Sequence, residues 1–180
     1  RASNCKLVIG LGGGSAIDAA KGIAIVLGHK RPIWDFCIGT DVPPITDKTY
    51  PIIAITTTSG TGSECTQWSV ITNPDTEEKP GIGSDYTFAK VAIVDPELMA
   101  TMPPKITAST GFDTLAHAIE AYTAVLETPI TDLGCEQAIR LVGRFLRRAV
   151  KNGQDREARN GMAYANSLAG IAISVGLVTV

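Results

Sequence analysis

A short apolar run that ends in three consecutive glycines and leads straight into a helix limits the fold of this chain more than any other feature. Residues 6–11 predict a buried strand, and the glycines at 12–14 predict a tight turn. Apolar residues then recur at helical spacing over 15–27. Ser15 and Asp18 form the pattern of a capping box at the start of this helix. A strand, a turn and a helix in this order are typical of α/β proteins.

The spacing of apolar residues changes near residues 97–104. Before this boundary, short apolar runs predict further strands at 52–56, 68–72 and 89–94, separated by a loop at 29–50 and a turn at 73–80. After Pro103 and Pro104, helical spacing dominates over 106–109, 111–126, 130–151 and 156–176. We therefore expect an α/β portion, residues 1–103, followed by an all-helical portion, residues 104–180.

Composition excludes several classes of protein. Hydrophobic residues make up 44% of the chain and charged residues only 19%, below the ~25% usual in soluble domains, so we expect a large buried core. A net charge of −2, with no basic run beyond Arg147-Arg148, argues against a nucleic-acid partner. The cysteines form no CxxC pair, which argues against a zinc ribbon or a disulfide framework and favours a cytoplasmic location. The uncharged stretch 162–180 has the length of a membrane span, but its many Ala, Gly and polar residues favour a buried helix, so no membrane partner is expected.

The glycine turn has more glycine than a turn needs, and this favours a phosphate site. Glycines let the backbone approach a phosphate, and the free N–H groups and dipole at a helix N-terminus favour an anion. Ser15 could donate to a phosphate oxygen, Asp18 could tie down the loop, and Lys21 would add a positive charge. The pattern is neither the usual dinucleotide motif nor a P-loop, and a tight turn before a capped helix fits the same residues.

A second polar loop, residues 56–63, consists of Thr, Ser and Gly and follows the predicted strand 52–56. In open parallel sheets, ligands bind beyond the carboxyl ends of the strands. Hydroxyls and backbone N–H groups suit a pyrophosphate and a ribose, so this loop and the glycine turn together favour one shared nucleotide site. A solvated connection is the alternative for this loop alone.

Asp113 and His117 are four residues apart, which on a helix places a carboxylate and an imidazole on one face. This pair suits a divalent metal such as iron or zinc, although a working site needs at least three protein ligands. Glu120 could contact one of these two ligands without binding the metal itself, or it could be a surface charge. His29 is the one other histidine and is not expected to be a ligand, because it lies in the other portion. A first-turn acid and a core histidine would give the same spacing.

The motifs agree, in order and spacing, with a known family across nearly the whole chain. They are Gly-Gly-Gly-Ser-Ala-Ile-Asp-Ala-Ala-Lys at 12–21, Thr-Thr-Ser-Gly-Thr-Gly-Ser-Glu at 57–64, Asp-Pro-Glu-Leu at 95–98, Met-Pro-Pro at 102–104 and Gly-Phe-Asp-Thr-Leu-Ala-His-Ala-Ile-Glu at 111–120. This ordered set resembles the iron-containing (group III) alcohol dehydrogenases. The resemblance implies a dehydroquinate-synthase-like fold in which residues 1–103 belong to an α/β domain that binds NAD or NADP and residues 104–180 begin a helical metal-binding domain. It places the family's first strands before Arg1 and two further histidine ligands after Val180, so we expect a fold that is incomplete at both ends.

The resemblance also implies roles for individual residues. Gly13, Gly14 and Ser15 would hold the cofactor pyrophosphate, with Asp18 and Thr57 in the same motifs. Thr58 and Thr61 would contact the nicotinamide half, and Lys79 and Leu98 would lie along the cofactor. Asp113 and His117 would be two of four ligands to Fe²⁺, with Zn²⁺ as the alternative metal. No side chain is assigned as catalytic.

The implied reaction is hydride transfer between NAD(P) and a primary alcohol or aldehyde, with the metal polarising the substrate oxygen. Small alcohols or aldehydes are the expected substrates, and a homo-oligomer is the expected assembly. Two alternatives stay open: a nucleotide-binding fragment without catalysis, and a relative on the same fold such as a zinc glycerol dehydrogenase or a dehydroquinate synthase. The substrate itself and the choice between NAD and NADP cannot be read from these residues.

Overall fold

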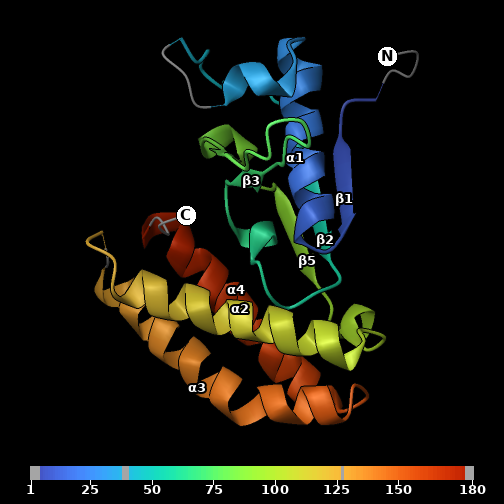
Figure 1. Ribbon diagram of the computed structural model, residues 1–180, viewed down its shortest axis with the longest axis vertical. Helices are drawn as coiled ribbons and strands as arrows, with labels where there is room; N and C mark the ends of the chain where they lie inside the picture. Colours follow the sequence, from blue (N-terminus) through green and yellow to red (C-terminus); the bar gives the residue numbers. More distant parts are fainter. Residues whose placement is uncertain (1–4, 38–40, 127, 177–180) are drawn as a thin grey trace.

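The computed structural model describes residues 5–37, 41–126 and 128–176. It has an α/β portion, followed along the chain by a group of packed helices (Figure 1). This order confirms the predicted fold class. Among the described residues, no helix has the length and apolar character needed to cross a membrane. The last residues of the uncharged stretch, 177–180, lie outside the described part.

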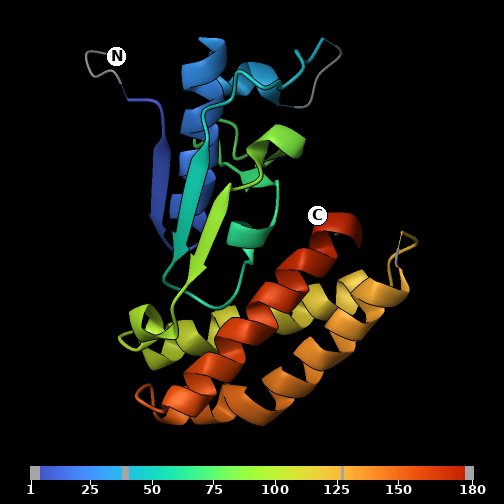
Figure 2. The ribbon, with the colours of Figure 1, turned by 180° about the vertical axis from the view of Figure 1, so that it is seen from behind.

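Three parallel strands form the main sheet of the α/β portion, in the order β1 (Val8–Gly12), β2 (Ile52–Thr56) and β5 (Val91–Val94). Helix α1 (Gly14–His29) covers one face, against which the central strand buries Ile52 and Ala54 completely. Figure 2 looks onto the opposite face, which α1 does not cover. The parallel pairing brings the carboxyl ends of all three strands to the same edge.

The rest of the α/β portion is made of short elements. Strands β3 (Ser69–Val70) and β4 (Gly81–Ile82) form a small antiparallel pair. Single turns of 3₁₀-helix lie at Ile33–Phe36, Ser63–Cys65, Asp85–Thr87 and Pro96–Met99. These short pieces connect the strands to α1 and to the helical portion.

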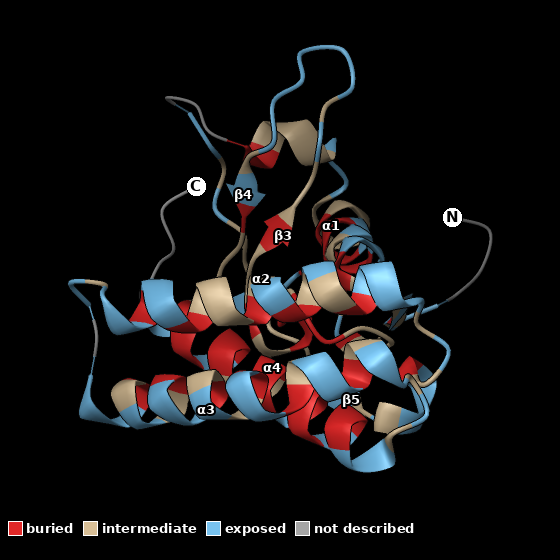
Figure 3. Ribbon diagram, turned by 60° about the horizontal axis from the view of Figure 1, so that its bottom comes forward, coloured by how far each residue is buried: buried red, intermediate tan, exposed pale blue. Residues whose placement is uncertain are grey.

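Helices α2 (Pro104–Tyr122), α3 (Pro129–Lys151) and α4 (Arg156–Gly176) pack side by side with their buried faces turned toward one another (Figure 3). Proline at the first position starts α2 and α3, and Thr128 adds a capping box to α3. Their shared core is rich in alanine and is completed by larger side chains; it includes Ala118, Ala138, Val142, Phe145, Ala158, Met162 and Ala165. Small residues allow these helices to lie close together.

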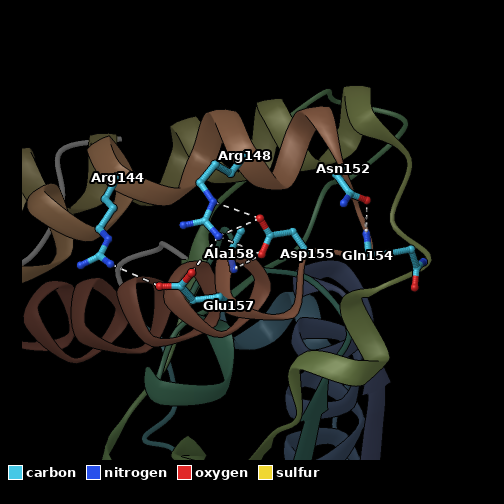
Figure 4. Close-up of polar contacts among 7 residues, drawn as sticks. All are labelled: Arg144, Arg148, Asn152, Gln154, Asp155, Glu157 and Ala158. Atoms are coloured by element: carbon cyan, nitrogen blue, oxygen red, sulfur yellow. Dashed lines mark hydrogen bonds and ion pairs between the residues drawn. The ribbon is translucent and has the colours of Figure 1, made fainter.

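Charged side chains join the end of α3 to the start of α4 (Figure 4). The guanidinium of Arg148 donates to both carboxylate oxygens of Asp155, at 3.0 and 3.1 Å, and to Glu157 at 2.8 Å. Asp155 also accepts a hydrogen bond from the backbone N–H of Ala158, at 3.0 Å, in the first turn of α4. The bond from Ala158 satisfies one of the free N–H groups at the start of α4, and the Arg148 bonds tie α3 to that helix end.

Several predicted elements differ from the observed ones. The predicted segments 106–109 and 111–126 form one continuous helix, because Gly111 packs closely against Leu146 and Met162 inside it. This helix ends at Tyr122. The predicted strand 68–72 is only two residues long, and β4 was not predicted. The predicted loop 29–50 contains a turn of 3₁₀-helix at Ile33–Phe36. Strand 52–56 is confirmed without change.

Candidate functional site

The glycine turn and the hydroxyl-rich loop meet at the carboxyl ends of β1 and β2. The backbone N–H of Thr57 donates to the carbonyl of Gly12 at 2.9 Å. Gly12 has a φ of +146°, a conformation that side chains rarely adopt. A Cβ on Gly14 would lie 2.5–2.9 Å from the side chain of Thr61, and one on Gly13 would lie 3.2 Å from that of Thr58. The glycines are therefore needed for the two loops to touch.

The predicted capping box was wrong. Gly13 is the N-cap of α1 and provides no side-chain hydrogen bond, so the first-turn N–H groups have no side-chain partner from that position. Ser15 is exposed, already inside the helix. Asp18 instead accepts a hydrogen bond of 2.5 Å from the hydroxyl of Ser63 and one of 3.2 Å from the N–H of Val70. It ties the second loop and β3 to α1, and its burial raises the pKa of its carboxyl despite these hydrogen bonds.

Lys21 does not offer its charge to a phosphate, contrary to the prediction. Its side chain is fully buried, and its ammonium donates to the carbonyl oxygens of Ser63, at 2.7 Å, and Trp68, at 2.6 Å. A third bond, of 3.0 Å, goes to the Ser63 hydroxyl. Burial lowers the pKa of Lys21 to about 8, although Asp18 and Glu64 favour the charged form. Lys21 therefore fixes the segment from Ser63 to Trp68 against α1.

Asp113 and His117 lie on α2, with 3.7 Å between Oδ1 of the carboxylate and Nε2 of the imidazole. Because α2 begins at Pro104, Asp113 is not a first-turn acid. Nδ1 of His117 is buried and has no hydrogen-bond partner among the described residues. Glu120 is exposed. His29 ends α1 and bonds to Ile25 and Thr46, consistent with its exclusion as a ligand.

A cavity of about 420 Å³ lies between the two portions. Residues from α1, the hydroxyl-rich loop, the β3–β4 region, α2 and α4 line it: Gly14, Ser15, Asp18, Thr61, Ser63, Trp68, Val70, Lys79, Gly81, Asp113, His117 and Ile173. The structure thus brings the glycine turn and the Asp113–His117 pair to one space.

Four of the predicted site residues do not line this cavity: Gly13, Thr57, Thr58 and Leu98. Gly13, Thr57 and Thr58 take part in the contact between the two loops, and Leu98, in the 3₁₀ turn after β5, is 40% exposed. Sequence reasoning missed Trp68, Val70, Gly81 and Ile173. An aromatic residue shortly after the hydroxyl-rich loop was a signal for the first, but nothing in the sequence pointed to the others.

The donors present fit half of a metal site. A carboxylate and an imidazole on one face are ligands that iron and zinc accept, and the unpaired Nδ1 shows that this histidine is not a satisfied core residue. Among the described residues, no group of three or more His, Cys, Asp or Glu side chains gathers at one place. A working metal site needs at least three protein ligands, so a metal held by this pair would need further ligands.

Known proteins of similar sequence and similar fold exist. The NAD-dependent methanol dehydrogenase of Bacillus methanolicus is 44% identical over 173 residues, which cover 96% of this chain and 45% of that protein. An archaeal halo-thermophilic alcohol dehydrogenase from a Red Sea brine pool superposes with a TM-score of 0.94 at 45% identity, over 98% of this chain and 45% of its own. The sulfoacetaldehyde reductase of Bifidobacterium kashiwanohense, solved in complex with NAD⁺, gives a TM-score of 0.91 at 43% identity, over 97% and 46%.

This chain spans about half the length of the relatives it matches. The model of the iron-containing alcohol dehydrogenase family matches residues 1–96, and the model of the C-terminal part of the Fe-containing alcohol dehydrogenase family matches residues 107–179. The two matches follow one another in the order of the α/β and helical portions. The chain belongs to the iron-containing alcohol dehydrogenase family.

Proposed function

We propose that the protein is a metal-dependent dehydrogenase that transfers hydride between NAD(P) and a primary alcohol or aldehyde. The observation that carries the proposal is the shared cavity, which has the helix N-terminus of α1, without a capping side chain, on one side and a carboxylate–imidazole pair on the other. Hydride transfer needs the cofactor and the substrate oxygen held next to each other. A cavity lined by both kinds of group meets that need.

In this proposal the cofactor lies along the meeting point of the two loops. Gly13, Gly14 and Ser15 hold the pyrophosphate at the N-terminus of α1, because N–H groups there have no capping side chain to compete with it. Thr58 and Thr61 contact the nicotinamide half, and Asp18 and Thr57 keep the loops in register. Lys79 and Leu98 lie along the cofactor. The relatives support NAD or NADP as the class of cofactor: one is named NAD-dependent, one was solved with NAD⁺, and one is named NADPH-dependent.

Asp113 and His117 would hold the metal, Fe²⁺ or Zn²⁺, together with ligands from outside the described residues. Such a metal supplies Lewis-acid polarisation of the substrate oxygen. In this chain the glycine turn and the Asp113–His117 pair line the same cavity. The names of the relatives indicate substrates as different as methanol and sulfoacetaldehyde. We therefore propose a substrate class, alcohols and aldehydes, and no single substrate.

A nucleotide-binding protein without catalysis is the second candidate, because the helix N-terminus at this cavity would serve such a protein equally. Titration with NADH and NADPH, followed by fluorescence, separates the candidates when it is combined with metal analysis. Binding of cofactor together with Fe²⁺ or Zn²⁺ supports the dehydrogenase. Binding of cofactor without metal favours the second candidate.

The glycine turn provides the matched variants for this titration. Gly14→Ala places a Cβ against Thr61 and should weaken NAD(P)H binding by at least about tenfold. Gly143→Ala is the control, because a Cβ there meets nothing within 4 Å. Equal cofactor affinity in both variants would contradict the assignment of the turn. The predicted homo-oligomer is tested separately by light scattering.

A further inference from the structure

Asn166, on α4, connects the helical portion to the hydroxyl-rich loop through both ends of its amide. Its side chain is completely buried. Oδ1 accepts the N–H of Gly62 at 3.0 Å, and Nδ2 donates to Oε1 of Glu64 at 2.7 Å. Glu64 is itself buried, and its other oxygen has no hydrogen-bond partner among the described residues. The amide therefore pairs with one donor and one acceptor of the loop.

The loop backbone rests directly on α4 at the same place. A Cβ on Gly62 would lie 2.6 Å from the Cα of Gly170, and one on Gly170 would lie 2.9 Å from the Cα of Gly62. Asn166 and Gly170 are one turn apart and share a helix face. Gly62 has a φ of +62°, which also favours glycine. Close contact on the bare backbone, together with two hydrogen bonds, leaves the loop little freedom to shift along α4.

The other side of this loop faces the proposed cofactor and the metal pair. Thr61 packs on Gly14 and lines the cavity, next to the Gly62 that Asn166 binds. A Cβ on Gly60 would lie 2.6 Å from the Cβ of Thr110 on α2, three residues before Asp113. The loop is thus packed between α1, α2 and α4. Its position sets the distance between the glycine turn and the Asp113–His117 pair.

We infer that Asn166 and Glu64 are positioning residues that hold Thr61 where the nicotinamide half of the cofactor binds, although neither lines the cavity. The inference rests on the proposed function. An apolar residue at position 166 would remove the partner of the Gly62 N–H and the amide donor to Oε1 of Glu64, at a buried position where such losses are costly. Burial raises the pKa of the Glu64 carboxyl, and its own backbone N–H, Lys21 and the Asn166 amide oppose that rise.

Exchanging the two functional groups tests the inference. Asn166→Asp keeps an acceptor for Gly62 but sets a carboxylate against that of Glu64. The double variant Asn166→Asp/Glu64→Gln restores a donor and an acceptor with their positions exchanged. Affinity is measured for NADH, for reduced nicotinamide mononucleotide, and for ADP-ribose, which lacks the nicotinamide.

The single variant should lose at least about tenfold in affinity for NADH and for the mononucleotide, as expected when a hydrogen bond to a charged group is lost. Its affinity for ADP-ribose should change little, and the double variant should recover most of the NADH affinity. An unchanged NADH affinity in the single variant overturns the inference. So does an equal loss for all three ligands that the double variant does not restore, since that describes a purely structural role. If the unaltered chain binds neither NADH nor NADPH, the proposed function falls as well.

Discussion

In the α/β portion, buried charged and polar side chains hold the loops in place, whereas in the helical portion small residues let apolar helices pack closely. Lys21, Asp18 and Ser63 form the first kind of contact under α1. Gly161, against the ring of Phe145, is an example of the second. Loops built from Gly, Ser and Thr have little apolar surface that could be buried. Polar contacts are the means left for fixing them, and these contacts are sensitive to pH and charge.

Replacing Lys21 is expected to have the largest effect on stability. Lys21→Met keeps most of the volume but leaves the carbonyl oxygens of Ser63 and Trp68 without their donor, beside two buried carboxyls. Breaking such a buried set should lower the free energy of unfolding by about 3 kcal/mol at pH 7. Urea denaturation followed by circular dichroism measures this change. A loss below about 1 kcal/mol would mean that the polar contacts do not hold these loops.

The stability of the wild type and of Lys21→Met can also be compared as a function of pH. The pKa of Lys21 is about 8 in the folded chain, below its ordinary value of 10.5. Between these values the unfolded chain binds more protons, so this group makes the folded state more stable as pH rises. The stability of the wild type relative to Lys21→Met should therefore increase by about 2 kcal/mol from pH 7 to pH 10. A constant difference across this range would contradict the buried position of the ammonium.

Gly161→Ala should have the next largest effect, because a Cβ at this position would overlap the Phe145 ring in the core between α3 and α4. Overpacking of this kind should lower the free energy of unfolding by about 2 kcal/mol. Gly143→Ala on the exposed side of α3 is the matched control and should raise it by somewhat less than about 1 kcal/mol, since alanine favours the helix. Similar effects of the two changes would show that close packing is not what stabilises the helices.

The smallest effect is expected at the surface of α3. Arg140 forms an ion pair of 3.3 Å with Glu136, and the two side chains are 76% and 47% exposed. Arg140→Ala should change the free energy of unfolding by less than about 0.5 kcal/mol. Thermal and urea denaturation of this variant should match those of the wild type. A larger loss of stability would mean that charged contacts stabilise the helical portion as much as they stabilise the α/β portion.

Local patterns predicted the parts of the molecule that depend on local forces. Strand 52–56 is a continuous apolar run of mostly β-branched residues, and it forms as expected. The packing of Gly111 against Leu146 and the burial of Lys21 depend on residues far along the chain. The local sequence therefore predicted a helix break that does not occur, and a role in phosphate binding that the buried Lys21 does not have. The β3–β4 pair is too short to have a periodic pattern.

The candidate site was predictable to a similar extent. Glycine and hydroxyl clusters after two strands indicated the loops, and helical spacing indicated the face shared by Asp113 and His117. That both groups line one cavity with Trp68 and Ile173 follows from the way α2 and α4 pack against the α/β portion. That arrangement is set by contacts such as Asn166 with Gly62, between residues that no local pattern connects.

Our main claim, that cofactor and metal share one cavity, can be tested by the fluorescence of bound NADH in the presence of Co²⁺. Co²⁺ accepts the ligands that suit iron and zinc, and it quenches a nearby fluorophore. We predict that Co²⁺ quenches the fluorescence of NADH bound to the wild type and that Zn²⁺ does not. His117→Ala should bind NADH nearly unchanged and show no quenching. Bound Co²⁺ that leaves the NADH fluorescence of the wild type unchanged would contradict the claim.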